Sequence, residues 1–262
     1  MSASEADELP VLFERIGRHV AVITLDRPAA HNAINAEMAD AIGAHVAEVE
    51  GDPEIRVAII AARGKSFCAG ADLKQVSAGF GRPVASRPGG FAGFVYARRE
   101  KPWIAAVHAN AYGGGTEIAL ACDMIVAAEE ASFTLPEVRR GLIPGAGGAI
   151  RAARFLPRAV ALELVASGAP LAARRAHALG LVNHLVPAMQ VLDEARALAE
   201  RIAANAPLAV RQAMRLTRAA GDLDDEALRA LQAEAVEIVR ASPDAAEGAR
   251  AFVEKREPNW GA

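Results

Sequence analysis

Cysteine and histidine are scarce in this sequence, and neither is arranged as a metal site. The two cysteines, Cys68 and Cys122, lie far apart in the chain and show no metal-type spacing. The six histidines include no H-E-x-x-H pattern and no other ligand pair. We therefore predict neither a metal site nor a disulfide framework.

Lysine is also rare. Only four of the 29 basic residues are lysines, at positions 65, 74, 101 and 255. Contacts to a phosphate-bearing ligand would therefore fall largely to arginine, whose planar guanidinium binds oxyanions bidentately. The composition suits such a ligand but does not identify one.

Long apolar runs and blocks of like charge are absent as well. The sequence has no stretch of about 18 apolar residues, and its N-terminus, MSASEADELP, is acidic and polar. The 32 acidic residues nearly balance the 29 basic ones, giving a formal net charge of −3. These absences predict a cytoplasmic protein that binds neither membranes nor nucleic acid.

The N-terminal part of the chain has an α/β pattern. Residues 11–16 and 20–25 are predicted strands, and apolar residues at helical spacing predict a helix over 36–50 with Asn35 as its N-cap. Further apolar runs predict buried strands at 57–61, 103–107 and 124–128. Successive strand–strand–helix units of this kind would stack into a spiral.

The C-terminal part has a different texture. From about residue 187 only helical patterns occur, including 224–240 and a helix that starts at Ser242-Pro243. We therefore predict a core over 1–186 and a helical region over 187–262. The Gly-, Pro- and Ser-rich segment 77–90 is the best candidate for a mobile loop.

Two glycine-containing segments follow predicted strands. KSFCAGADL (65–73) has small residues that let a ligand approach the backbone, although, taken alone, the segment is more typical of a tight strand-to-helix turn. The three glycines of ANAYGGGTEIALACD (109–123) can expose N–H groups at the start of a helix, where a developing negative charge is favoured. The alternative explanation is that they only allow close packing of the helix on the sheet. Ile118 and Ile150 stand where a dinucleotide fingerprint needs its third glycine, so a Rossmann-type oxidoreductase is disfavoured.

Two glutamates are placed for acid–base chemistry. Glu117 lies about one helical turn past the first glycine of the GGG run, so its carboxylate can face whatever those glycines hold. Glu137 follows Pro136, which fixes the approach of the chain. Each residue alone is more typical of a solvated surface charge. The pair beside a glycine-rich helix start indicates proton transfer at an activated carbonyl.

These segments together resemble the crotonase superfamily, and within it the enoyl-CoA hydratase branch. The matching motifs occur in family order along nearly the whole chain: LDRPAAHNAIN (25–35), SFCAGADL (66–73), AYGGGTEIALACD (111–123), FTLPEVRRGLIPGAGG (133–148), AHALGLVNHLV (176–186) and AFVEKREPNW (251–260). The resemblance implies a crotonase-like spiral of ββα units with a C-terminal helical oligomerisation region, and a homotrimer or a dimer of trimers.

The resemblance also implies the site. The backbone N–H groups of Ala71 and Gly114 would form an oxyanion hole for a thioester carbonyl, and Glu117 and Glu137 would be the acid–base pair. The substrate would be an acyl-CoA thioester, with coenzyme A as part of the substrate and no separate cofactor. Implied CoA- and substrate-binding residues are Arg27, Ala33, Ala69, Gly70, Asp72, Leu73, Gly113, Phe252 and Lys255.

Several alternatives stay open at this point. Three segments resemble those of carnitinyl-CoA dehydratases, which use the same two glutamates: PGGFAG (88–93), SFTLPE and the C-terminal tail. A CoA- or RNA-binding relative without hydratase activity is a reading from another class. Cys68 is predicted to be a packing residue instead of a nucleophile, and His108 to be structural. Aromatic residues that could line an acyl pocket, or serve the core, are Phe80, Phe91, Phe94 and Tyr96.

Overall fold

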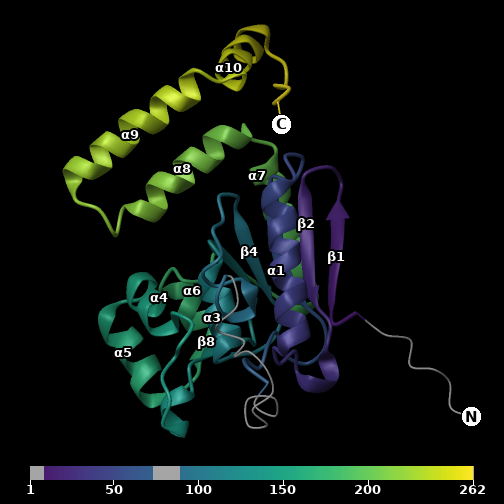
Figure 1. Cartoon of the computed structure of the whole chain (residues 1–262), viewed down its shortest axis with the longest axis vertical. Helices are drawn as coiled ribbons and strands as arrows, with labels where there is room; N and C mark the ends of the chain where they lie inside the picture. The colour runs from purple at the N-terminus through teal and green to yellow at the C-terminus, as the bar shows by residue number, and fades with distance from the viewer. Residues whose placement is uncertain (1–8, 73–88, 262) are drawn as a thin grey trace, which may run out of the picture.

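The computed structural model of the chain describes residues 9–72 and 89–261. Its largest layer is a six-stranded sheet in the order β1-β2-β3-β4-β6-β9 (Figure 1). β1 runs antiparallel to β2, and each later neighbour pairs in parallel. The strands are β1 Val11–Ile16, β2 Val20–Leu25, β3 Val57–Ala62, β4 Trp103–Val107, β6 Met124–Ala128 and β9 His184–Val186. All the strands predicted from apolar runs are therefore confirmed.

A second, three-stranded sheet is built from very short strands in the order β5-β7-β8. These are β5 Ala111–Tyr112, β7 Ser132–Thr134 and β8 Leu171–Ala172. Isolated bridges join Ile34 to Ala71 and Cys68 to Ala111. Because parallel strands share their carboxyl ends at one edge of a sheet, the segments that follow β2, β3 and β4 lie next to one another there.

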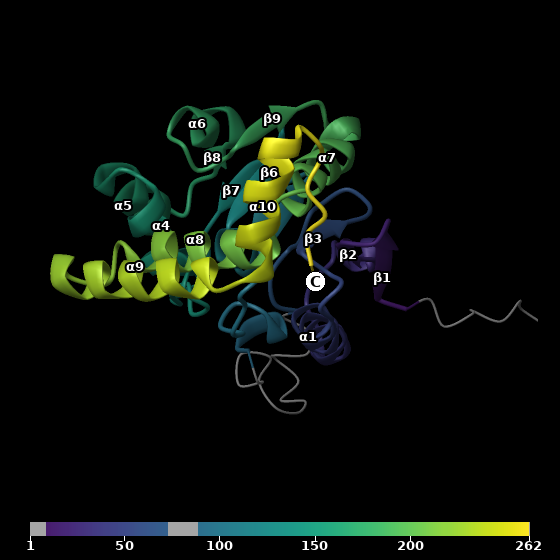
Figure 2. The same cartoon turned by 90° about the horizontal axis from the view of Figure 1, so that it is seen from above.

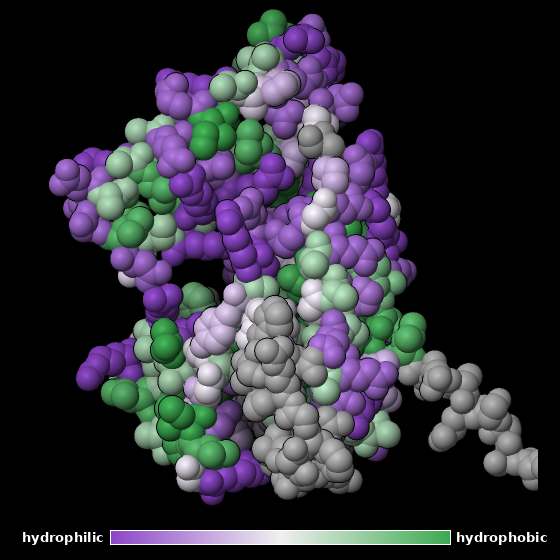
Figure 3. Space-filling view, in the orientation of Figure 1, coloured by the Kyte–Doolittle hydropathy of each residue, from purple (hydrophilic) through white to green (hydrophobic). Residues whose placement is uncertain are grey.

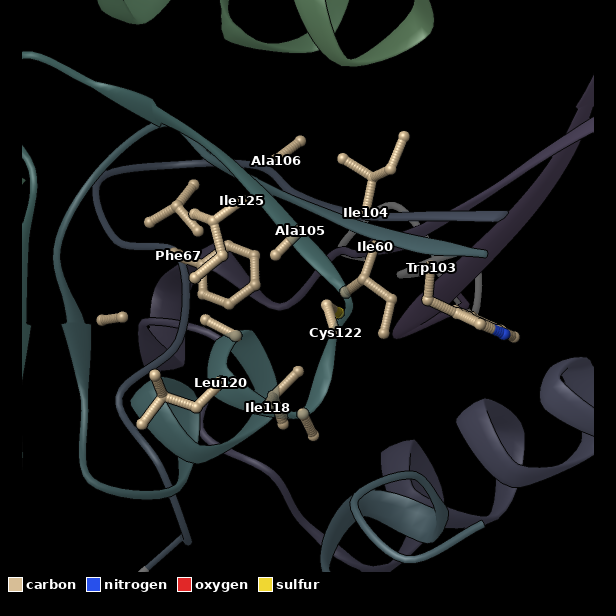
Figure 4. Close-up of a cluster of buried hydrophobic side chains, with 14 of the residues drawn as sticks. Ile60, Phe67, Trp103, Ile104, Ala105, Ala106, Ile118, Leu120, Cys122 and Ile125 are labelled. Carbon is tan, nitrogen blue, oxygen red and sulfur yellow. The ribbon is translucent and has the colours of Figure 1, made fainter. Parts of the chain in front are cut away.

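Helices cover both faces of the large sheet. α1 (Ala36–Gly51) contacts β1 and β2, and its N-cap Asn35 accepts a hydrogen bond from Met38 N at 2.9 Å, as predicted. α7 (Val191–Ala203) packs against β3, β4 and β6. α3 (Gly114–Ala121) contacts β4 and buries Ile118 and Leu120 within the apolar cluster drawn in Figure 4. The apolar strand runs are thus buried because each face of the sheet is covered.

Shorter helices fill the region between the strands and the C-terminal part, and the sequence patterns did not predict them. They are α4 Gly148–Phe155, α5 Arg158–Ser167 and α6 Ala173–Ala178. One-turn 3₁₀ helices occur at η1 Pro28–Ala30, η3 Phe91–Gly93, η4 Glu137–Arg140 and η5 Ala188–Gln190. Most of the predicted loop 77–90 lies outside the described residues, and its last two residues lead directly into η3.

The remaining helices are α8 (Pro207–Ala219), α9 (Asp225–Arg240) and α10 (Pro243–Glu254). Asp224 and Ser242 cap α9 and α10 with their side chains, as the sequence indicates. α8 and α9 lie side by side and apart from the large sheet (Figures 1 and 2). Only helices follow residue 187 in the described chain, but α7 packs on the sheet. The first helix of the predicted helical region, α7, is therefore still part of the core.

Arg218 anchors α8 to the core. Its guanidinium binds both carboxylate oxygens of Asp123 at 2.8 Å and the backbone oxygens of Arg99 and Lys101 at 2.9 and 3.0 Å. Such a bidentate pair fixes orientation as well as distance. None of the helices in the described ranges is long and apolar enough to cross a membrane.

Candidate active site

Gly70 brings the two predicted oxyanion-hole residues together. Its φ of +89° favours glycine, and its Cα faces the start of α3 so closely that an added Cβ would lie 3.0 Å from Gly114 N and from Tyr112 O. Ala71 and Gly114 are therefore neighbours in space although they are distant in sequence. A side chain at position 70 would separate them.

The N–H groups of Ala71 and Gly114 are both available. The bridge to Ile34 uses the Gly70 carbonyl, at 2.7 Å, and the Asp72 N–H, at 3.0 Å, and leaves the Ala71 N–H pointing to the other side. Gly114 is the first residue of α3, where backbone donors have no partner within the helix. Within the described ranges neither N–H has a hydrogen-bond acceptor. The pair can therefore bind one anionic oxygen.

Close packing explains the glycines that follow. A Cβ on Gly114 would collide with the ring of Phe91, and one on Gly115 would collide with the carbonyl of Cys68. Gly113 has a φ of +51°, and an added Cβ there would lie 2.9 Å from an oxygen of Glu137. The GGG run is thus required both for helix packing and for the approach of Glu137. Helix packing, one of the two explanations that the sequence left open, is therefore seen in the structure, and the oxyanion role stays a prediction.

Glu117 is buried and fixed by backbone donors. Its side chain is 3% exposed, and its Oε1 accepts hydrogen bonds from Ala146 N at 2.7 Å and from Gly148 N at 2.8 Å. Burial raises the pKa of Glu117, while the two N–H groups and the nearby Arg151 cation oppose that shift. Oε1 is held in place, which leaves Oε2 to act on a ligand.

Glu137 has a different environment. It opens η4 after Pro136, and its Oε2 is buried without a hydrogen-bond partner in the described part of the chain. Burial raises the pKa of Glu137, and the negative charge of Glu117 raises it further. The backbone N–H of Glu137 itself and the Arg140 cation oppose these shifts, but an oxygen buried without a donor, such as Oε2, is best accommodated in a protonated carboxyl group. Burial thus raises the pKa of both glutamates, and the two differ in their partners: Glu117 Oε1 accepts two backbone N–H groups, whereas Glu137 Oε2 accepts none in the described part of the chain.

The predicted CoA-binding residues near the N-terminus come together beside the oxyanion donors. Arg27 Nη1 donates to the Ala33 carbonyl and to Asp72 Oδ2, both at 2.9 Å. Ala69 N donates to the His31 carbonyl at 3.0 Å. Arg27 thus joins the segment around Ala33 to Asp72, and the Ala69 N–H joins the same two segments through His31. Leu73 lies outside the described residues.

The buried Asn32 holds this region in place, and the sequence did not reveal it. Its side-chain nitrogen donates to the carbonyl groups of Arg63, Ser66 and Phe67 at 2.8 to 3.2 Å. Its side-chain oxygen accepts from Arg27 N at 2.8 Å. One fully buried amide therefore joins the segments that follow β2 and β3.

The two predicted C-terminal binding residues are not near this site within the same chain. Phe252 is 85% exposed on α10, and Lys255 ends that helix in the left-handed region with a φ of +53°. α10 lies at the opposite end of the molecule from α3 (Figure 1). Contact with the CoA of a neighbouring subunit remains a prediction for both residues.

Cys68 and His108 have structural roles in the described chain. Cys68 is fully buried, its thiol donates to the Asn32 carbonyl at 3.1 Å, and burial raises its pKa to about 12. A thiol held protonated in this way is a poor nucleophile. His108 Nε2 donates to the Gly64 carbonyl at 2.9 Å. These contacts agree with the predicted packing and structural roles.

The candidate aromatic residues divide between core and site. Phe94 is buried edge-on to Trp103, with 5.2 Å between ring centroids, and belongs to the core. Phe91 packs on Gly114, and Tyr96 is 59% exposed beside the Arg151 guanidinium. Phe80 lies outside the described residues. Across residues 9–72 and 89–261 no group of three or more His, Cys, Asp or Glu side chains could hold a metal ion.

Comparison with known proteins places this arrangement in a family. The sequence profile of the enoyl-CoA hydratase/isomerase family matches residues 15–262. The chain belongs to this family. A carnitinyl-CoA dehydratase of Salmonella paratyphi A is 43% identical over 244 residues, which cover 91% of this chain and 93% of that protein. The crotonase resemblance is therefore confirmed.

Solved structures of family members share the fold. The crystal structure of an enoyl-CoA hydratase from Mycobacterium tuberculosis H37Rv is similar with a TM-score of 0.93 and 43% identity, covering 97% of this chain and 99% of that one. A carnitinyl-CoA hydratase structure from Mycobacterium avium is 46% identical, with a TM-score of 0.77 and coverage of 97% and 98%. These matches confirm the crotonase-like α/β fold with its C-terminal helices.

In this family member the sequence reasoning missed the groups that hold Glu117. The run GAGGAI (145–150) lacks the third glycine of a dinucleotide fingerprint, and the sequence assigns it no other role. Its backbone N–H groups at Ala146 and Gly148 instead bind the Glu117 carboxylate. A Cβ on Gly148 would lie 2.8 Å from Glu117 Cγ, which explains the glycine. The signal was present as a second glycine-rich helix start, at α4.

Proposed function

We propose that the protein is an enoyl-CoA hydratase, which adds water reversibly to trans-2-enoyl-CoA and gives 3-hydroxyacyl-CoA. The observation that carries the proposal is the arrangement of two unlike carboxyl groups around one pair of free backbone donors. Glu137 lies against Gly113, the N-cap of α3, and Gly114 is the next residue. Glu117 lies about one turn further along α3. The charge of Glu117 also raises the pKa of Glu137.

The donors fit the electron movement of hydration. When hydroxide adds to Cβ of the conjugated thioester, an electron pair moves to the carbonyl oxygen and forms an enolate. The N–H groups of Ala71 and Gly114 would stabilise that oxygen, helped by the dipole at the start of α3. One such donor contributes about 10²–10³ in rate.

The unequal environments assign the proton transfers. Glu117, held by two N–H groups next to a cation, would act as the base that takes a proton from the attacking water. Glu137, whose environment favours the protonated form, would give its proton to Cα as the enolate collapses. Water thus supplies OH to Cβ. The starting protonation states are restored when the proton on Glu117 passes to Glu137, directly or through solvent.

The same assignment gives a pH dependence. Hydration requires Glu117 to be ionised and Glu137 to be protonated, so the rate should fall below the pKa of the first and above the pKa of the second. Burial raises both pKa values. Both limbs of the profile should therefore lie at higher pH than free glutamate would give.

We also propose that the protein acts as a homotrimer or a dimer of trimers. Figure 3 shows apolar side chains gathered over α4 and α5 on the molecular surface. Exposed apolar residues in this region are Leu142, Ile143, Ile150, Phe155 and Leu162. Phe252 and Val253 are 85% and 79% exposed on α10. Exposed apolar side chains in these two places support burial against further copies of the chain.

Carnitinyl-CoA dehydration is the second candidate, because similar relatives carry that name. A trimethylammonium acyl group is usually held on an aromatic face. Among the described residues, Tyr96 is an exposed aromatic side chain beside the loop that holds Glu117, but the Arg151 guanidinium already lies 5.2 Å from its ring centroid. A second cation there would be repelled. This observation favours an uncharged acyl chain.

A panel of substrates tests the proposal. Purified protein is incubated with enoyl-CoA esters from C4 to C16 and with crotonobetainyl-CoA, and loss of the enoyl thioester absorbance is followed. Hydration of simple enoyl-CoA esters is expected, and preferential turnover of crotonobetainyl-CoA would establish the second candidate. CoA-ester binding without turnover of any member would indicate a non-catalytic relative. Glu137→Gln should abolish most activity, and hydration within a few-fold of the parent would contradict the two-glutamate mechanism.

A further inference from the structure

We infer that Arg151 is a positioning residue for hydration, because its guanidinium joins the loop that holds Glu117 to the segment that packs on Gly114. Arg151 lies on the first turn of α4 and does not belong to any role assigned above. The inference rests on the proposed function, since it concerns the same two groups. Arg151 would orient Glu117 and the oxyanion donors without touching the substrate.

The guanidinium spans two segments that are distant in sequence. Nη1 donates to the Ala146 carbonyl at 2.7 Å, and Nη2 donates to the Val95 carbonyl. The Tyr96 ring lies beside it, with 5.2 Å from Cζ to the ring centroid. The planar fork of arginine can bind two carbonyl groups in fixed directions, which a single ammonium cannot do.

On one side the contact supports the base. Ala146 offers its carbonyl to Arg151 and its N–H to Glu117 Oε1, at 2.7 Å in each case. Gly147 follows with a φ of +91°, and a side chain there would collide with Arg151 Nη1. The loop is therefore clamped between Arg151 and the carboxylate that it orients.

On the other side the contact supports the oxyanion donor. Val95 closes the turn that begins at Phe91, with Val95 N donating to the Phe91 carbonyl at 3.3 Å. The Phe91 ring packs directly on Gly114. Holding the Val95 carbonyl therefore holds the ring that confines the first N–H of α3.

Charge gives the contact a second consequence. The Arg151 cation lowers the pKa of Glu117 against the effect of burial, and so favours the ionised base. Glu137 is the other charged group that interacts with Glu117. Around Arg151 itself the titratable or charged groups are, besides Glu117, the side chains of Tyr96, Arg99, Cys122 and Arg154. Among the cations in this set, only Arg151 acts on Glu117 in the described structure.

The test compares Arg151→Met and Arg151→Lys with the parent over a pH series, using crotonyl-CoA hydration. Arg151→Met should lower kcat by about 10²-fold, since loss of a clamp permits misplacement of the base on the order of 1 Å. KM should change by less than a few-fold. The low-pH limb should move to higher pH. Arg151→Lys keeps the cation, so its low-pH limb should stay in place while kcat falls.

Arg158→Met is the matched control, because Arg158 is an exposed arginine at the start of α5. It should behave like the parent. Parental kcat in both Arg151 variants, or a reduced kcat in Arg151→Met with an unmoved low-pH limb, would overturn the inference. If Arg151→Met does not fold, Arg151→Lys alone decides: a lower kcat with an unmoved low-pH limb supports the inference, and a parental kcat overturns it.

A measurement without turnover separates this inference from the proposed function. The pKa of Glu117 is followed by NMR of protein with ¹³C-labelled glutamate, with Glu117→Gln to assign the signal. Arg151→Met should raise that pKa whether or not the parent hydrates an enoyl-CoA. Absence of hydration in the parent would refute the proposed function alone, whereas an unchanged Glu117 titration would refute the role of Arg151.

Discussion

Replacing Glu117 with glutamine tests the site most directly, because the structure allows the change without rearrangement. Oε1 accepts from Ala146 N and Gly148 N at 2.7 and 2.8 Å, and a glutamine oxygen can accept both bonds in the same place. The volume is nearly unchanged. The variant therefore removes the charge and the capacity to accept a proton, and leaves the shape of the site as it was.

The expected loss is in kcat. Removing a general base lowers the rate by about 10²–10⁴-fold, which corresponds to about 2.7–5.4 kcal/mol in the activation barrier. KM for crotonyl-CoA should change by no more than a few-fold, because the CoA portion is expected at the Arg27 and Ala69 side of the site. Steady-state hydration kinetics at neutral pH measure both constants.

Stability should change in the opposite direction from activity. A carboxyl whose folded-state pKa is raised destabilises the protein above that pKa, because the ionised form is buried at a cost. Glu117→Gln should therefore unfold at a higher temperature than the parent at neutral pH. The difference should shrink as the pH falls and Glu117 becomes protonated. Thermal unfolding followed by circular dichroism measures it.

Glu163→Gln is the control, since Glu163 is an exposed glutamate on α5 paired with Arg175 at 3.3 Å. Exposed pairs of this kind contribute little, so activity and stability should match the parent. Two results would refute the reasoning: a Glu117→Gln enzyme with kcat within a few-fold of the parent, or a rise in KM as large as the fall in kcat.

Three further predictions follow from individual contacts. Gly70→Ala should lower kcat by about 10²–10³-fold, because its φ of +89° and the 3.0 Å approach to the start of α3 leave no room for a methyl group; full activity in a folded variant would remove the oxyanion assignment. Burial raises the pKa of both Cys68 and Cys122 to about 12, so iodoacetamide at mildly alkaline pH should label neither thiol before urea is added, as mass spectrometry would show. Phe252→Ala should raise KM for acyl-CoA and weaken the oligomer in light scattering, whereas Met189→Ala, which changes a 92% exposed side chain outside α10, serves as control; parental values for Phe252→Ala would confine the site to one subunit.

The sequence was sufficient for features that depend on neighbours along the chain. Strands such as 57–61 and 103–107 are short apolar runs, and their burial follows from composition. Helix starts at Asn35 and Ser242 follow from capping side chains three residues before the donors that they satisfy. The family motifs also identified the fold, because each motif is a short segment of neighbouring residues and the motifs occur in the family's order along the chain.

The tertiary structure alone decided how distant segments meet. The second sheet is made of strands of two or three residues, too short to leave a periodic pattern. Ala146 and Gly148 hold Glu117 through backbone N–H groups, and Arg151 acts through its reach to two carbonyl groups. Backbone donors carry no residue identity, so the glycine-rich start of α4 indicates free N–H groups but not the direction in which they point. Chain folding fixes those directions, and with them the different environments of the two glutamates.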